Sequence, residues 1–220
     1  MKFQFKIQQY QTDAVDAVVQ VFNGQRKYER GSELRNPGFR NLETVRMNLP
    51  EAGGDGPEDL LLDVGCRNAE VELSDEALLA NIQRLQAVNN IKRSDSLVRN
   101  LGCCSLDIEM ETGTGKTYVY IKTMFELNKR YGWSKFIVVV PSIAIREGVK
   151  KSFEITADHF MEQYGKKARF FVYNSSNLTQ LDNFSAGAGI HVMIINTQAF
   201  AASLNEEKNV EGRMGDAAAR

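Results

Sequence analysis

The chain has 220 residues, of which 43% are hydrophobic and 25% charged, and its formal net charge is −1. This composition is typical of a globular, water-soluble protein with one hydrophobic core and room for a small second lobe. The nearly balanced charge excludes a protein that coats nucleic acid through its bulk charge, so any contact with DNA must be local.

The sequence predicts a cytoplasmic protein without a membrane segment. No apolar run approaches the roughly 20 residues that span a bilayer, and the first residues lack the long apolar stretch of a secretory signal. The cysteines Cys66, Cys103 and Cys104 cannot form a disulfide framework, and with His159 and His191 they do not give the spacing of a zinc site. They are interpreted as reduced, structural cysteines.

The N-terminal part combines a helix with a long insertion. A helix is predicted from about Thr12 to Phe22, because its apolar residues fall on one face, and Tyr10 and Gln11 stand directly before it. Residues 23–100 change in character, with charged and glycine-rich stretches typical of loops, and are interpreted as an insertion. Within it, Ser74 begins a segment with apolar residues at helical spacing, so part of the insertion is predicted to be ordered.

A glycine-rich segment from Met110 to Thr117 predicts a site for the phosphates of a nucleoside triphosphate. Gly113 and Gly115 permit backbone angles that residues with a Cβ avoid, so that successive N–H groups can turn inward and form an anion-binding nest together with those of Thr112 and Thr114. Lys116 is expected to reach the β- and γ-phosphates as the catalytic lysine, and the Thr117 hydroxyl to ligate Mg²⁺ at the start of the next helix, whose positive end adds attraction.

The surrounding sequence supports this interpretation. The general phosphate-loop pattern has glycine where this chain has Met110, but helicases and translocases of superfamily 2 often carry another residue there and keep Thr-Gly-x-Gly-Lys-Thr, which this sequence matches. Ser105 to Glu109 alternates like a strand and Lys116 to Lys129 is predicted as a helix. The alternative is a glycine- and threonine-rich turn that binds nothing.

Strands and helices alternate through the C-terminal half. Residues 135–140 form a β-branched run that suits a strand buried on both faces. A helix from about Ile145 to Phe160, a strand near Ala168 to Tyr173 and a strand within Ile190 to Ile195 are predicted to follow. This order indicates an α/β fold with a mainly parallel sheet flanked by helices, in which ligands bind beyond the carboxyl ends of the strands.

Four segments resemble the N-terminal part of the Res subunit of type III restriction enzymes: Tyr10-Gln11, Met110 to Thr117, Ile137 to Val149 and Ile194 to Phe200. The resemblance implies the first RecA-like motor domain of superfamily 2, a P-loop NTPase that binds ATP and Mg²⁺, with the insertion before its phosphate loop. It also implies that Gln11, next to Tyr10, reads the adenine edge of ATP, and a glutamine amide can donate to and accept from adenine. The alternative for Gln11 is a solvated residue at a helix start.

The same resemblance implies contacts with other macromolecules. Ser142, Arg146 and Thr197 match positions that line the groove for the backbone of double-stranded DNA, where hydroxyls and helix-start amides position DNA without reading its sequence. The alternatives are a surface arginine for Arg146 and a strand-end cap for Thr197. In this family, recognition of the DNA sequence belongs to the partner methyltransferase subunit, Mod.

One motif required for hydrolysis was not found. An apolar strand ending in Asp-Glu would help to hold Mg²⁺ and orient the attacking water, but residues 59–63 and Asp75-Glu76 precede the phosphate loop and are interpreted as insertion structure. Residues 205–220 show no strand pattern, and the second motor domain and the nuclease domain of the family are absent from the sequence.

Three hypotheses follow. In the first, the chain is the ATP-binding N-terminal part of an ATP-dependent restriction endonuclease subunit, with an adenine-recognition segment and first helix (1–22), the insertion (23–100), a partial motor domain incomplete at its C-terminus (101–204) and a tail (205–220). The second is a stand-alone P-loop nucleotide-binding or kinase-like protein. In the third, the chain folds poorly because a shortened parallel sheet exposes a strand edge.

Overall fold

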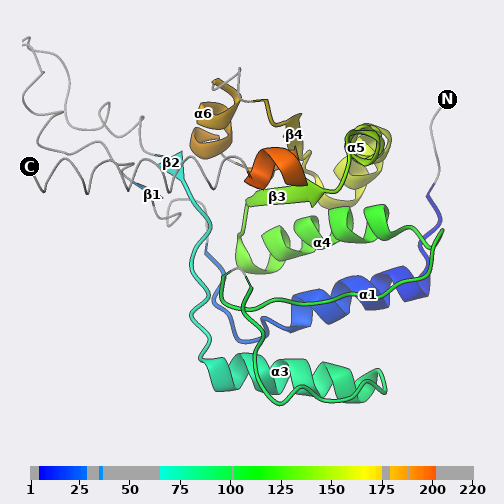
Figure 1. Cartoon of the computed structure of the whole chain (residues 1–220), viewed down its shortest axis with the longest axis vertical. Helices are drawn as coiled ribbons and strands as arrows, with labels where there is room; N and C mark the ends of the chain where they lie inside the picture. Colours follow the sequence, from blue (N-terminus) through cyan, green and yellow to red (C-terminus); the bar gives the residue numbers. More distant parts are fainter. Residues whose placement is uncertain are drawn as a thin grey trace, which may run out of the picture.

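The computed structural model describes residues 5–28, 35–36, 65–100, 102–174, 179–187 and 189–201 (Figure 1). The helices are α1 (Gln9–Gln20), α3 (Asp75–Val88), α4 (Lys116–Tyr131), α5 (Ile143–Tyr164) and α6 (Thr179–Ala186). The strands are β1 (Arg35–Asn36), β2 (Gly65–Cys66), β3 (Lys135–Val140), β4 (Arg169–Val172) and β5 (His191–Asn196). A helical turn over 197–201 follows β5.

The predicted parallel sheet is confirmed and has three strands in the order β3-β5-β4. His191, the first residue of β5, pairs with Lys135 of β3 on one side and with Arg169 of β4 on the other. The three strands therefore begin at one level and run in the same direction. The central strand β5 is buried over its first five residues, which fits a strand with neighbours on both sides and both faces covered. Outside this sheet, β1 and β2 form an antiparallel pair that the sequence did not predict.

Two predictions about strands were wrong. Residues 105–109 are extended but belong to no sheet, and they run beside α1 rather than next to β3 (Figure 1). The alternation of apolar and polar residues does not produce one covered side, since Ile108 is 46% exposed, and this pattern alone supplies no hydrogen-bonding partner. Strand β3 is also not buried on both faces, because Ile137 is 50% and Val139 42% exposed, while Phe136 and Val138 face the core.

The helices begin and end close to the predicted residues, with one difference of consequence. Helix α1 starts at Gln9, so Tyr10 and Gln11 lie in its first turn and not before it. Ser74 caps α3 as predicted, since its hydroxyl accepts from the Ala77 N–H at 3.3 Å. The carboxyl ends of α4 and α5 are set by glycines in the left-handed conformation. Helix α6 was not predicted, and the expected tail at 205–220 lies outside the described residues.

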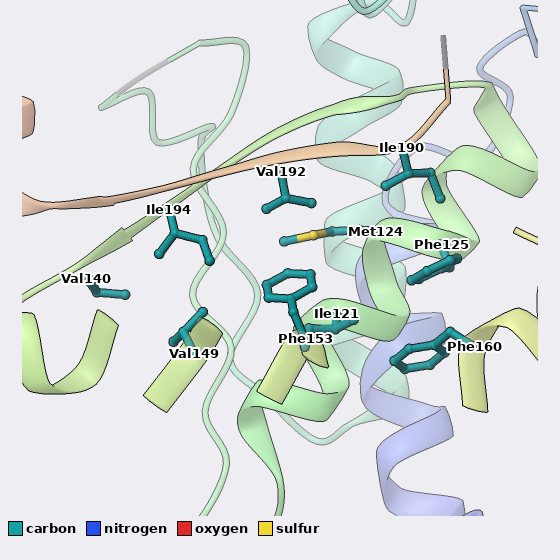
Figure 2. Close-up of a cluster of buried hydrophobic side chains, with 10 residues drawn as sticks. All are labelled: Ile121, Met124, Phe125, Val140, Val149, Phe153, Phe160, Ile190, Val192 and Ile194. Carbon is teal, nitrogen blue, oxygen red and sulfur yellow. The ribbon is translucent and has the colours of Figure 1, made fainter. Parts of the chain in front are cut away.

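Helix α4 is held between the sheet and α1. Figure 2 shows one cluster of buried side chains contributed by α4, β3, α5, β5 and the residue before β5: Ile121, Met124, Phe125, Val140, Val149, Phe153, Phe160, Ile190, Val192 and Ile194. A second cluster joins α1 to the other side of α4: Val15, Val19, Val119, Tyr131 and Trp133. Because full burial of such a side chain contributes about 1.5–3 kcal/mol, these two clusters fix the position of the α4 N-terminus.

Two further expectations are tested in the described part of the chain. None of the helices there is long and apolar enough to cross a membrane. Cys103 and Cys104 are free thiols, as predicted, and burial raises the pKa of Cys104 to about 11.

Candidate functional site

The predicted phosphate loop forms a tight turn at the N-terminus of α4. Gly113 has φ +83° and Gly115 has φ +86°, which is the left-handed region that glycine adopts without steric penalty. Gly115 is also the N-cap of α4, and its carbonyl accepts the Val119 N–H at 3.0 Å. The turn therefore leads directly into the helix end that carries the positive partial charge.

Lys116 folds back over this turn. Its Nζ lies 2.5 Å from the Met110 carbonyl oxygen and 2.8 Å from that of Glu111. The side chain is exposed, so the ammonium is held by loop carbonyls within reach of a ligand. Phosphate oxygens carry full negative charge and make stronger, charge-assisted hydrogen bonds than carbonyls do, so an anion at the helix end can take over this ammonium.

Met110 explains how the loop tolerates a residue other than glycine at this position. Its carbonyl accepts from Lys116, while its side chain packs at the edge of the apolar cluster between α1 and α4. Met110, which stands where the general phosphate-loop pattern has glycine, therefore attaches the loop to the cluster between α1 and α4 and leaves the turn itself intact.

Gln11 lies against the loop although 103 residues separate it from Thr114. Its Nε2 donates to the Thr114 carbonyl at 2.9 Å. A Cβ added to Gly115 would lie 2.6 Å from the same nitrogen, so the missing side chain of Gly115 makes room for the amide. Tyr10 is 49% exposed and lines a groove of about 820 Å³ that also reaches Thr114. The structure thus brings Gln11 into contact with the phosphate loop and places Tyr10 in the groove beside it.

The described residues offer Mg²⁺ few ligands of their own. Thr117 stands in the first turn of α4, two residues after the N-cap Gly115. Within the described ranges, no group of three His, Cys, Asp or Glu side chains is arranged to hold a metal. Since Mg²⁺ prefers six oxygen ligands and is commonly bound through substrate phosphates and water, the site fits an ion that arrives with a nucleotide and takes one ligand from Thr117.

The three predicted DNA-contact residues gather at one edge of the sheet. Val140 pairs with Asn196, so β3 and β5 end at the same level, and Ser142 and Thr197 follow these ends. Ser142 caps α5 by accepting the Ile145 N–H at 3.3 Å. One turn later on α5, Arg146 pairs with the Glu147 carboxylate at 3.1 Å. Figure 1 shows β3 pointing toward the side on which α4 begins, so this edge and the phosphate loop face the same side of the molecule.

Sequence reasoning missed a polar and aromatic cluster where the segment before α1 meets α4 and α5. The Tyr118 hydroxyl lies 2.9 Å from His159 Nε2, and the Phe5 ring stacks on Tyr118 with centroids 5.9 Å apart. Burial lowers the pKa of His159, an effect opposed by Glu162 and reinforced by Lys122. Tyr118 directly follows Thr117, so its position next to the phosphate loop could have marked it as a candidate residue. No pattern in the sequence indicates that His159 lies near it.

A family model described as "Type III restriction enzyme, res subunit" matches residues 69–215, more than half of the chain. The Res subunit of the type III restriction-modification enzyme EcoP15I from Escherichia coli is 35% identical over 148 residues, covering 59% of this chain and 15% of that protein.

Two further relatives have the same description. The EcoPI Res subunit of Escherichia phage P1 is 33% identical over 150 residues, again covering 59% of this chain and 15% of its own length. The StyLTI Res subunit of Salmonella typhimurium is 47% identical over 62 residues, which cover 28% of this chain and 6% of that protein. The chain thus spans about 15% of the length of the first two relatives.

Proposed function

Because the chain belongs to the family of type III restriction enzyme Res subunits, we propose that it is the ATP-binding N-terminal part of an ATP-dependent DNA translocase subunit. The observation that carries this proposal is the turn at the start of α4, with two left-handed glycines and the Lys116 ammonium folded over it. Such a turn presents backbone N–H groups, a helix dipole and a mobile cation to one ligand.

Each loop residue has a defined task in this proposal. Lys116 leaves the carbonyls of Met110 and Glu111 and binds the β- and γ-phosphates, where its charge offsets the charge that develops on the transferred phosphoryl group. Thr117 offers its hydroxyl as one ligand to Mg²⁺, which when bound neutralises phosphate charge. The N–H groups of residues 112–115 surround the phosphates.

Gln11 and Tyr10 are assigned to the base. The Gln11 amide already lies against the loop through Thr114, and a rotation of its side chain would turn the donor and the acceptor of the amide toward the edge of adenine. Tyr10 is exposed in the same first turn of α1 and lines the groove that reaches Thr114, so its ring is assigned to the base as well.

The fold supports the finer assignment as the first RecA-like domain of a superfamily 2 motor. The parallel sheet, the loop-to-helix transition and the placement of Ser142, Arg146 and Thr197 at the same side as the loop are what such a motor needs in order to couple nucleotide to DNA. In the complete protein, ATP hydrolysis and DNA cleavage would require further domains and a Mod methyltransferase partner.

Binding of a fluorescent ATP analogue with Mg²⁺ tests the proposal, with Lys116→Ala as the variant and Lys150→Ala, an exposed lysine of α5, as the matched control. We expect binding by the unmodified chain and the control, and a loss of at least about tenfold in Lys116→Ala because a charge-assisted contact of about 1.5–3 kcal/mol is removed. Equal binding by the two variants would refute the role of the loop. ATP turnover is measured in parallel with and without duplex DNA, and rapid DNA-stimulated turnover would show that this part needs no further domain for hydrolysis.

A further inference from the structure

Lys122 is a buried cation whose location in the fold calls for an explanation. It lies on α4, is 5% exposed, and its Nζ is 3.4 Å from the Thr12 hydroxyl oxygen on α1. No ion pair joins it to a carboxylate in the described part of the chain. Burying an ammonium with one long hydrogen bond is unfavourable, and a side chain such as methionine would fill a similar space without that penalty. Stability alone therefore does not account for a lysine at this place.

The bond from Lys122 continues into the backbone of α1. Lys122 donates to Thr12 Oγ1, and the same hydroxyl can donate its own proton to the Gln8 carbonyl at 3.3 Å. These directions are compatible, because an ammonium only donates and a hydroxyl both accepts and donates. The buried cation is thus connected to the first turn of α1.

That turn also carries Gln11, the residue next to Thr12. Neighbouring residues of a helix point about 100° apart around its axis, so Gln11 reaches the loop carbonyl of Thr114 while Thr12 faces Lys122. Two contacts in different directions fix the rotation of α1 about its own axis. The apolar contacts of Val15 and Val19 with α4 hold the two helices together, but they are not directional and resist rotation less.

The two contacts come from different places in the loop and the helix. Gln11 bonds to Thr114 in the loop, whereas the backbone of Lys122 stands six residues after Lys116, or roughly 9 Å further along α4. Because Gln11 and Thr12 are neighbours, both contacts hold the first turn of α1, one from the loop and the other from the Lys122 side chain. A substitution at Lys122 would change the position of Gln11 through the orientation of α1 and would leave the residues of the loop unchanged.

We propose that Lys122, acting through Thr12, is a positioning residue that holds the Gln11 amide at the phosphate loop and so sets the preference of the site for adenine. This inference rests on the proposed nucleotide-binding function. It assigns Lys122 no contact with the nucleotide, and it predicts that base selectivity and phosphate binding can be separated.

The test uses Lys122→Met, Thr12→Val and Gln11→Ala, with the exposed Lys150→Met as control. Each is measured for binding of ATP, GTP and inorganic tripolyphosphate with Mg²⁺. In Lys122→Met and Thr12→Val we expect the preference for ATP over GTP to fall by about fivefold, the effect of one lost hydrogen bond, with unchanged affinity for tripolyphosphate. The double variant Lys122→Met, Gln11→Ala should have the same preference for ATP over GTP as Gln11→Ala alone, because both changes remove the same interaction.

The other outcomes are decisive as well. Binding of ATP with an unchanged ratio of ATP to GTP in Lys122→Met would overturn the inference while the proposed function stands. An equal loss of ATP and tripolyphosphate binding would overturn it too, since Lys122 would then act on the phosphates or on the fold. If the unmodified chain binds none of the three ligands, the proposed function fails, and hydrogen exchange decides the structural part. Lys122→Met must then speed exchange in α1 without lowering the melting temperature, and unchanged exchange would refute the positioning role.

Discussion

Replacing Gly115 by alanine measures the contact between α1 and the phosphate loop. Its φ of +86° is a left-handed conformation, which costs a residue with a Cβ about 1–2 kcal/mol. The new Cβ would also lie 2.6 Å from Gln11 Nε2, so the amide must move and its bond to the Thr114 carbonyl is lost, at about 0.5–1.5 kcal/mol. We expect Gly115→Ala to lower the free energy of unfolding by about 1.5–3.5 kcal/mol.

Gly113→Ala is the matched control within the same turn. Gly113 has nearly the same φ, but a Cβ there meets nothing within 4 Å, so only the backbone penalty of about 1–2 kcal/mol applies. Urea denaturation of both variants gives the difference directly, provided that the dependence of stability on urea concentration is unchanged. In a Gln11→Ala background the excess cost of Gly115→Ala should disappear. Equal costs for the two glycines in the unmodified background would refute the contact between Gln11 and the loop.

Three further predictions follow from the described contacts. The pKa of His159 lies below its ordinary value of 6.5, chiefly because of burial, so its contribution to stability is full above pH 6.5 and is lost as the pH falls through the lowered value of the folded state; denaturation of His159→Phe across this range should lack that component, and an identical pH dependence would contradict the assignment. Phe160 is 1% exposed and stacks on Phe125 at 4.8 Å, so Phe160→Ala should lower the free energy of unfolding by about 3–5 kcal/mol in urea denaturation; a cost below 1 kcal/mol would place Phe160 outside the core. Arg146→Ala should weaken binding to duplex DNA of any sequence and reduce the slope of log affinity against log salt by about 0.9, whereas a loss confined to one sequence would exclude a backbone contact.

The sequence was sufficient where structure depends on neighbouring residues. Helix α4 begins after Gly115 and ends before Gly132 because local backbone preferences and apolar spacing agree along its whole length. The loop glycines could likewise be assigned from their order, since a left-handed turn before a helix is specified within a few residues. Ser74 was placed at a helix start for the same reason, whereas Ser142 was singled out only by the family resemblance and its cap on α5 was not predicted.

Predictions failed where structure depends on distant partners. The segment 105–109 alternates like a strand, but a strand exists only if another strand supplies hydrogen bonds, and this segment instead lines the groove beside α1. The run of β-branched residues in β3 indicated burial on both faces, yet the described helices leave Ile137 and Val139 exposed. The bond from Gln11 to Thr114 and the buried Lys122 are tertiary contacts that spacing along the chain does not reveal.

The first part of the long insertion between α1 and the phosphate loop, residues 26–69, does not separate the two parts of the site, because the residues on either side of it are joined. The Gln25 amide donates to the Glu70 carbonyl at 3.3 Å and accepts the Glu72 N–H at 2.8 Å. The Asn68 side chain then accepts the N–H groups of Ser134 and Lys135 at 2.8 and 2.9 Å, immediately before and at the first residue of β3.

The chain therefore leaves and returns at one place, next to the end of α4 that is remote from the loop. Closing a longer loop costs only about 0.6 kcal/mol for each doubling of its length, so the length of this first part of the insertion has little influence on the packing of α1 against α4. Gln11 and Lys116 are placed by that packing and by the contacts at the α4 N-terminus, so the two helices set the phosphate end of the candidate site. The later part of the insertion, from Ile82 to Val98, lines the groove beside Tyr10 and so belongs to the site.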